Sequence, residues 1–229
     1  MWGATLAGFG SRRPRSFAAY RIPRQPWWRR LLHVTSPLPA PANHPWTRPK
    51  WMGPPESEIG VAVPVRSVFP SPPGIAIALT DCVAFSNGFE FGIAVRARHE
   101  LKGEEMGFGP PPLRGGFGTE RQLQIGVQFA DGRRATGGNP GAAFMDYLEA
   151  VREGREPVVN GGPILSHRGA GGGGKTWDFR YWVWPLPPEG RLTFTCEWPE
   201  RNLAETTYEV NGTEILLAGQ SSTKLWDEA

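Results

Sequence analysis

Residues 88–98 read GFEFGIAVRAR, and this stretch decides the fold class of the chain. Large apolar side chains stand at every second position, namely Phe89, Phe91, Ile93 and Val95. A β-strand turns successive side chains to opposite faces of a sheet, so this alternation predicts a strand with one face in the core. The same period of two recurs along the chain in residues 61–69, 122–129, 176–184, 191–198 and 205–210.

Turn residues come directly before this stretch and predict a hairpin. The tripeptide at residues 86–88, Ser-Asn-Gly, separates it from an earlier apolar segment. A three-residue loop with its glycine in the left-handed conformation pairs Phe85 with Phe89. It also pairs Val83 with Phe91, which keeps these apolar side chains on one face. We therefore expect this register rather than a two-residue turn.

The expected register has two consequences for the strand before the turn. It places Asp81 opposite Ile93, which requires a bulge or an end-of-sheet position near Asp81. It also turns Cys82 away from the core, whereas the alternation in residues 191–198 turns Cys196 inward. Because the chain has only two cysteines and no secretory signal, we expect both to be reduced thiols in the cytoplasm.

A second hairpin is predicted from the aromatic stretch TWDFRYWVW and the later strand at residues 191–198. The loop PLPPEG at residues 185–190 joins them. Pairing Val183 with Leu192 gives the two strands a continuous apolar inner face. We expect them to be neighbours in one sheet.

The remaining pattern fixes the fold class. The 30 glycines and 24 prolines among 229 residues exclude a helical bundle, and a parallel sheet would need alternating helices that are not present. Helices are predicted only at residues 139–154 and 213–225, the second with capping-box spacing at Asn211 and Glu214. We predict an all-β fold, an antiparallel, immunoglobulin-like β-sandwich or an open barrel, with one or two short peripheral helices.

The chain divides by charge into residues 1–55 and residues 56–229. The first segment has eight arginines, Lys50 and no acid, whereas the second has 16 basic and 22 acidic residues. Ten prolines in the first segment predict a disordered or extended arm, and the second segment is the expected β-sandwich domain. No run of 18 apolar residues occurs, so we expect no membrane-spanning helix.

Four interpretations of the arm stay open. It is a disordered leader or a misassigned start, with Met52 as the true first residue. It is an organellar transit peptide, since it is rich in arginine and free of acid. Residues 24–30, RQPWWRR, bind nucleic acid or anionic membrane through charge and stacking. Or the arm docks on a protein partner.

Residues 169–176 read GAGGGGKT and match the pattern of a phosphate-binding loop. Such a loop must open a helix, but a period-two aromatic segment follows it here. We therefore expect a glycine-rich hairpin loop and not a nucleotide hydrolase. Arg168, Gly174 and Lys175 remain candidates for binding an anion on this loop without hydrolysis.

The sequence offers little for catalysis. Four histidines, two of them in the arm, assemble no metal set of usual spacing, so we expect no metal and no cofactor. His167 is the one credible general base, with Asp178 as an orienting group, and nothing in their spacing separates them from ordinary loop residues. Pairs of carboxylates, at residues 104–105 and at 149 and 153, favour a solvated role. We name no catalytic residue, and enzymatic activity stays uncertain.

The outer face of the aromatic strand is the strongest candidate for binding. Trp182 and Trp184 lie on it beside Arg180, and together they could contact the side chains of a protein partner. The alternative, which the pattern favours, is that the arm, the helix near Leu148 or a second subunit covers this face.

Four motifs carry a resemblance. They are GFEFGIAVR (88–96), GVQFADGRRAT (126–136), WDFRYWVWPLPP (177–188) and LTFTCEWPERNLAET (192–206). In this order they resemble a group of uncharacterised proteins from high-GC bacteria, over the chain from about Trp46 to the C-terminus. The resemblance implies a bacterial cytoplasm and transfers no catalytic residue.

We therefore expect a non-enzymatic β-sandwich that binds a macromolecule or associates with itself through the aromatic face at Trp182. One alternative is an anion binder or enzyme at residues 167–176. The other is a protein that binds nucleic acid or anionic membrane through its basic arm.

Overall fold

The alternating segments form antiparallel sheets in the computed structural model of the chain. The structure describes residues 48–106, 122–137, 147, 149–155 and 163–226. They all belong to a unit that spans Thr47–Ala229. This unit begins before residue 56, so residues 48–55, which the sequence assigned to the arm, are part of it. The arm's other predictions, like the helix start at Asn139, lie outside the described residues.

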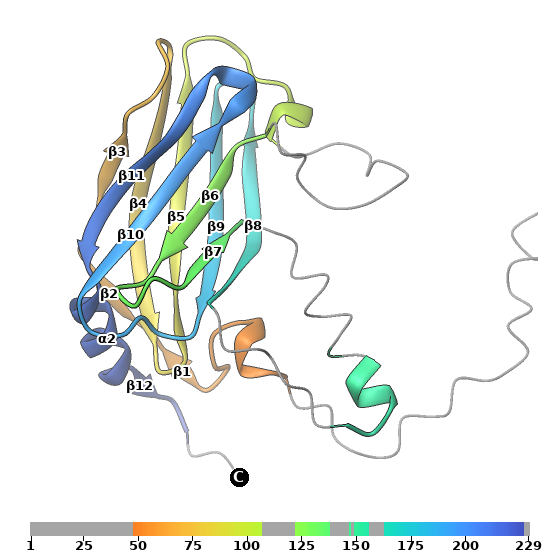
Figure 1. Cartoon of the computed structure of the whole chain (residues 1–229), viewed down its shortest axis with the longest axis vertical. Coiled ribbons are helices and arrows are strands. Elements are labelled where there is room, and N and C mark those ends of the chain that lie inside the picture. The colour runs from red at the N-terminus through yellow and green to blue at the C-terminus, as the bar shows by residue number, and fades with distance from the viewer. Residues whose placement is uncertain (1–47, 107–121, 138–146, 148, 156–162, 227–229) are drawn as a thin grey trace, which may run out of the picture. The chain divides into compact units, whose positions relative to one another are not determined.

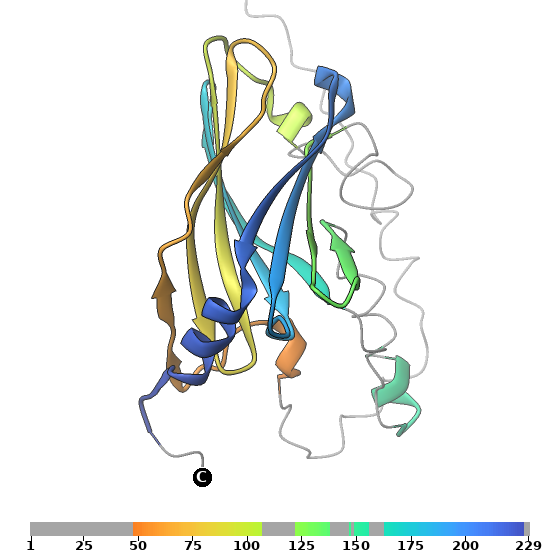
Figure 2. The same ribbon diagram turned by 60° about the vertical axis from the view of Figure 1, so that its left-hand side comes forward.

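Two sheets face each other (Figures 1 and 2). The larger sheet has the strand order β2-β4-β5-β9-β8, and β3 also pairs with β4. Its strands are β2 (Val61–Val63), β3 (Ser67–Phe69), β4 (Ile75–Phe85), β5 (Gly88–Ala97), β8 (Ile164–Gly173) and β9 (Thr176–Trp184). The smaller sheet has the order β11-β10-β6-β7. Its strands are β6 (Gln124–Gln128), β7 (Arg134–Thr136), β10 (Arg191–Trp198) and β11 (Leu203–Asn211). The prediction of an antiparallel β-sandwich is confirmed.

Short elements lie around the sandwich. A two-stranded sheet joins β1 (Glu58–Ile59) to β12 (Thr223–Lys224). The helical elements are η2 (Lys50–Met52), η3 (Gly103–Met106), η4 (Pro199–Arg201), α2 (Gly212–Gln220) and the helical residues 149–152. Among the described residues, no helix has the length and apolar character needed to cross a bilayer.

The core lies between the two larger sheets. Phe89, Phe91 and Phe194 are fully buried, and the ring centroids of Phe91 and Phe194 lie 5.0 Å apart, edge to face. The alternating residues of β6 and β10 also face inward, since Val127 and Trp198 are fully buried. The period-two pattern therefore identified the core face of β5, β6 and β10.

The register of the β4–β5 hairpin differs from the prediction. Phe85 pairs with Gly88 across a two-residue turn, and Ala84 pairs with Phe89. Near the turn, the small side chains Ala84 and Cys82 of β4 face the core, because the phenylalanines of β5 fill the space there. The ring of Phe85 packs against Trp182 on the outer face instead, with centroids 6.0 Å apart.

The predicted bulge near Asp81 is confirmed, although its partner is not. The register shifts between Leu79 and Asp81, and Asp81 lies opposite Gly92 rather than Ile93. Because of the new register Cys82 is buried, so the prediction that it faces outward is wrong. Both cysteines are free thiols, as expected.

The predicted pairing of β9 with β10 is also wrong. β9 pairs with β5 and β8, and β10 pairs with β6 and β11. Residues 185–190 lead from the larger sheet to the smaller one, so Val183 and Leu192 face each other's sheets instead of sharing a ladder. The inward faces were identified correctly, since two facing apolar surfaces satisfy the same alternation.

The C-terminal helix begins as predicted and ends early. The Thr213 amide donates to Asn211 Oδ1 (3.1 Å), and Asn211 Nδ2 donates to Glu214 Oε1 (3.1 Å). α2 ends at Gln220 instead of Leu225. The chain then turns extended, because β12 pairs with β1.

Candidate functional site

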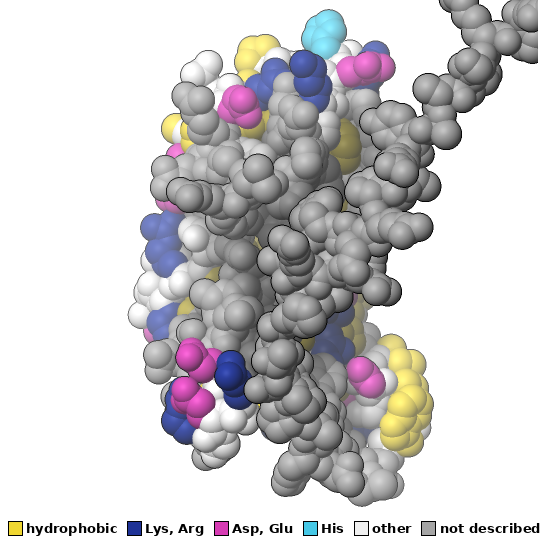
Figure 3. Space-filling view, turned by 90° about the vertical axis from the view of Figure 1, so that its right-hand side faces the viewer, with side chains coloured by type: hydrophobic (Ala, Val, Ile, Leu, Met, Phe, Trp, Pro, Cys, Tyr) yellow, Lys and Arg dark blue, Asp and Glu magenta, His cyan; other side chains and the backbone are white. Residues whose placement is uncertain are grey.

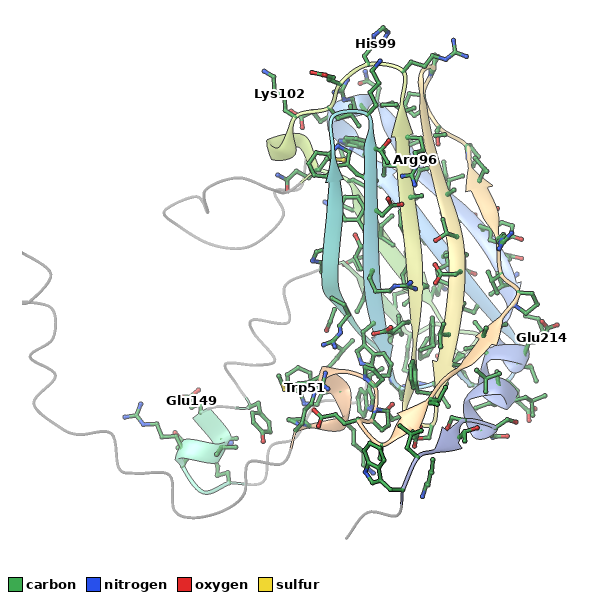
Figure 4. All side chains as sticks on the ribbon, turned by 180° about the vertical axis from the view of Figure 1, so that it is seen from behind. Trp51, Arg96, His99, Lys102, Glu149 and Glu214 are labelled. Carbon is green, nitrogen blue, oxygen red and sulfur yellow. The ribbon has the colours of Figure 1, made fainter. Side chains whose placement is uncertain are left out.

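Three ion pairs run along the outer face of the larger sheet, which Figure 4 views directly. Near η2, Arg168 Nε lies 3.7 Å from Glu90 Oε1. At the middle of the face, Arg180 Nη1 donates to Asp81 Oδ2. Toward the other end, Arg96 Nη2 donates to Asp178 Oδ1 (2.7 Å). The face is therefore polar and charge-paired over much of its length.

The central pair crosses a strand. In the ladder, Asp81 on β4 lies opposite Gly92 on β5, which lies opposite Arg180 on β9. A Cβ atom added to Gly92 would lie 2.2 Å from Asp81 Oδ1. The arginine reaches the aspartate over β5 because the residue between them has no side chain.

An open hollow of about 400 Å³ lies on this part of the sheet. Asp81, Asp178 and Arg180 are among its lining residues, and Gly169 and Gly171 of β8 border it. Arg180, a predicted partner-binding residue, is half-exposed here. The hollow thus joins charged side chains to the edge of the sheet.

β8 forms that edge and contains two kinds of glycine. Position 172 requires glycine, because its φ is +128° and a Cβ atom there would lie 2.1 Å from the Thr176 carbonyl oxygen. Gly169, Gly171 and Gly173 have no such constraint, since a Cβ atom at each would meet nothing within 4 Å. β8 ends the strand order, so one side of its backbone has no strand partner in the described part of the chain (Figure 1).

The phosphate-loop motif forms a hairpin, as predicted. Gly173 pairs with Thr176 across the two-residue turn Gly174-Lys175, and the φ of Gly174 is +59°. The Gly174 carbonyl accepts from the Leu101 amide (2.9 Å), which fixes the turn. Strand rather than helix follows, so the element that would hold a nucleotide phosphate is replaced.

The three candidate anion ligands do not converge. Lys175 is exposed on the turn beside Gly174. Arg168 lies in the middle of β8, roughly 16 Å of strand away from Gly173. Its Nη1 donates to the Met52 carbonyl (3.1 Å), so it already has a partner. The prediction of one anion site from these residues is not supported by their placement.

Trp182 lies on the outer face, but its side chain is not accessible to a partner. Its side chain is fully buried, and Nε1 donates to the Trp51 carbonyl (3.0 Å). η2 therefore covers it, which is one of the three kinds of cover that the sequence left open. Trp184 remains partly exposed. Direct contact of Trp182 with a partner, the leading expectation, is excluded while η2 stays in place.

The sequence missed the anchoring of η2. Asn87 Nδ2 donates to the carbonyls of Lys50 (2.7 Å) and Gly53 (3.0 Å). The indole of Trp51 is 4% exposed and lies edge to face with Tyr147, with ring centroids 6.1 Å apart (Figure 4). The signal in the sequence was a tryptophan, Trp51, that lies two residues after Pro49 and two residues before Gly53, where a docked turn could have been predicted.

The proposed catalytic pair is not formed. His167 packs on the core side of β8 against Tyr181, with centroids 5.5 Å apart, and against Phe179. Asp178 lies on the opposite face of the sheet and pairs with Arg96. Partial burial lowers the pKa of His167, and Asp178, the carboxylate considered for orienting it, is paired elsewhere.

The cysteines and acidic residues offer no reactive group either. Burial raises the pKa of Cys82 and that of Cys196 to about 12, so both thiols stay protonated and inert. Among the described residues, no three His, Cys, Asp or Glu side chains gather closely enough to hold a metal ion.

Models of known protein families, curated proteins and solved structures were compared with the chain, and none of them matches it. The function of the chain is therefore inferred from the geometry of the outer face and of β8. Figure 3 looks toward the β8 side and shows basic and acidic side chains next to each other at both ends of the described surface.

Proposed function

We propose that this chain is a non-enzymatic protein-interaction domain that accepts an extended segment of another polypeptide as an added strand along β8. Strand addition uses the unpaired amides and carbonyls of a sheet edge for affinity and side-chain sites beside it for specificity. β8 provides the edge, and the hollow at Asp81, Asp178 and Arg180 provides the side-chain site.

The three unconstrained glycines of β8 carry the proposal. Glycine inside a strand costs roughly 0.5–1 kcal/mol relative to alanine, because it loses more freedom on folding. At Gly169, Gly171 and Gly173 no steric requirement for glycine offsets this cost, since a side chain would meet no neighbour among the described residues. Bare glycine in a strand suits the close approach of another backbone.

The outer face also indicates the chemistry of the partner. Arg180 reaches Asp81 across Gly92, two strand spacings away. An added strand would lie two spacings from Asp178, with Gly171 between them in the ladder. A long basic side chain on that strand can make the same crossing, since each spacing is about 4.8 Å. We expect a partner segment with an arginine or lysine at this position.

Several finer expectations belong to the same proposal. The buried free thiols at Cys82 and Cys196 fit a reducing compartment, which supports a cytoplasmic protein. The two facing antiparallel sheets fit an immunoglobulin-like architecture. The bacterial origin implied by the four motifs is likewise retained as a proposal.

The test uses a labelled strand-forming peptide, Thr-Val-Thr-Arg-Thr-Val-Thr, and a second peptide with Gln in place of Arg. On binding, the amide resonances of residues 169–173 should shift, and the Gln peptide should bind at least fivefold more weakly. Gly171→Thr should abolish binding. Ala204→Thr, on the exposed edge strand β11, is the matched control and should bind normally. Unchanged β8 resonances at millimolar peptide would overturn the proposal.

A further inference from the structure

The contacts that hold η2 resemble those between a protein and a bound peptide. No strand ladder includes residues 50–53. Side chains from three places in the larger sheet donate to successive backbone carbonyls instead. Asn87 bonds Lys50 and Gly53, Trp182 bonds Trp51, and Arg168 bonds Met52. This recognition is mainly of the turn's backbone carbonyls, and the Arg48 side chain of the same segment also donates to the Met52 carbonyl (3.2 Å).

One side chain of the turn enters the sheet's surface. Trp51 is buried, whereas Lys50 is exposed and Met52 is partly exposed. A large aromatic side chain supplies most of the apolar area that such a contact can bury. The pocket is therefore specific for a turn with one central tryptophan.

The fit of this turn is incomplete. Ser166, which lies opposite Trp182 in the ladder, is 5% exposed, and its Oγ has no hydrogen-bond partner within the described structure. Asn87 Oδ1 and Trp51 Nε1 are buried and unpaired in the same region. A buried polar group without a partner costs about 1–3 kcal/mol. A turn that offered polar groups to Ser166 and Asn87 would bind better than residues 48–53 do.

We propose that Asn87, Ser166, Arg168 and Trp182 form a binding site for a tryptophan-bearing turn of a partner protein, and that residues 48–53 occupy it as a displaceable cover. The short segment of residues 54–57 connects the cover to β1. A partner turn with the same indole and a better polar match would take its place. This site does not depend on strand addition at β8.

The experiment uses the full chain with Trp51→Ala and a synthetic peptide of residues 48–55, RPKWMGPP, in isothermal titration calorimetry. The Trp51→Ala chain, whose cover lacks the indole, should bind the peptide. The wild-type chain should bind the peptide at least tenfold more weakly, because its intact cover competes. The peptide with Ala in place of Trp should not bind. Adding Asn87→Ala to Trp51→Ala should weaken binding about tenfold.

Two controls keep the result decisive. Trp226→Ala removes a tryptophan that is 60% exposed, so it should behave like wild type. If Trp51→Ala does not fold, Trp51→Leu keeps apolar bulk and still removes the indole. A folded variant, judged by dispersed amide resonances, that fails to bind the peptide overturns the proposal. So does a wild-type dimer that Trp51→Ala dissolves, because the occupant would then be a second copy.

Discussion

The indole N–H of Trp182 donates to the backbone carbonyl of Trp51 over 3.0 Å, and 131 positions separate the two residues in the sequence. This bond joins a proline-rich segment to the larger sheet near the end of β9. It makes residues 48–53 a structural part of the domain and hides the aromatic face that the sequence marked for binding.

Shortening the chain to start at Met52 should destabilise the domain. The change removes Trp51, and loss of a buried tryptophan costs about 3 kcal/mol or more. Urea denaturation followed by circular dichroism measures the difference. Trp226→Ala should stay within about 0.5 kcal/mol of wild type. Equal midpoints for the full and shortened chains would show that η2 contributes nothing.

Neighbouring glycines of β8 should respond in opposite ways to substitution. Gly171→Thr should leave stability unchanged or raise it by up to about 1 kcal/mol, since threonine favours strands. Gly172→Ala should lower stability by about 2 kcal/mol or more, because its positive φ and the nearby Thr176 carbonyl leave no room for a Cβ atom. Thermal melts of both variants compare them, and a destabilised Gly171→Thr would contradict the geometry.

Gly92→Ala should break the pair between Asp81 and Arg180. The added Cβ atom would approach Asp81 Oδ1 to 2.2 Å and Thr80 Oγ1 to 2.4 Å, so we expect a loss of about 1–3 kcal/mol. In an Asp81→Ala background the same change should cost clearly less, because the closest obstacle is gone. A double-mutant cycle of unfolding free energies measures this coupling, and strict additivity would rule it out.

Glu58 should make stability depend on acid pH. Partial burial raises the pKa of Glu58. Hydrogen bonds from the Ser86 hydroxyl (2.6 Å), the Ser86 amide (3.0 Å) and the Ser222 hydroxyl (3.0 Å) together lower it by more than burial raises it, so the pKa in the folded state is depressed. A depressed folded pKa contributes stability above the unfolded pKa, and this is lost as pH falls through the folded value. Wild type should therefore exceed Glu58→Gln in stability at pH 7, and the gap should close on acidification. A gap independent of pH would exclude the charge as its cause.

Both cysteines should resist thiol reagents in the folded protein. Burial raises the pKa of each thiol to about 12, so almost no thiolate exists at pH 8. Titration with a chromogenic disulfide should label no thiol before unfolding and two per chain after it. Fast labelling of the native protein would mean that the core opens readily.

The sequence predicted the local structure well because strand alternation is a local property. The inward residues of β5, β6 and β10 and the cap of α2 follow from neighbouring residues, whereas the bulge near Asp81 was inferred from a register that the structure does not have. The partners of β9 did not, because Val183 and Leu192 have the same apolar alternation whether they share a ladder or face each other across the core. Pairing of sheets is set by long-range packing.

The arrangement of the outer face was predicted in part for a similar reason. Alternation placed Trp182 and Arg180 on the outer face correctly. That Trp51 covers the indole depends on hydrogen bonds to backbone carbonyls, which no side-chain pattern encodes. The distinction between Gly171 and Gly172 depends on backbone dihedral angles and could not come from a run of identical letters.

The edge at β8, which has no strand partner among the described residues, also limits how the protein can be handled. Natural sheets guard their edges with charge, proline or a bulge, since an exposed edge is a template for aggregation. Here the register shift between His167 and Gly169, with Arg168, guards only the middle of the strand. The remaining glycines carry no gatekeeper residue. If the edge accepts one strand, as proposed above, it accepts others as well, so we expect colloidal stability at high concentration to depend on keeping that edge occupied.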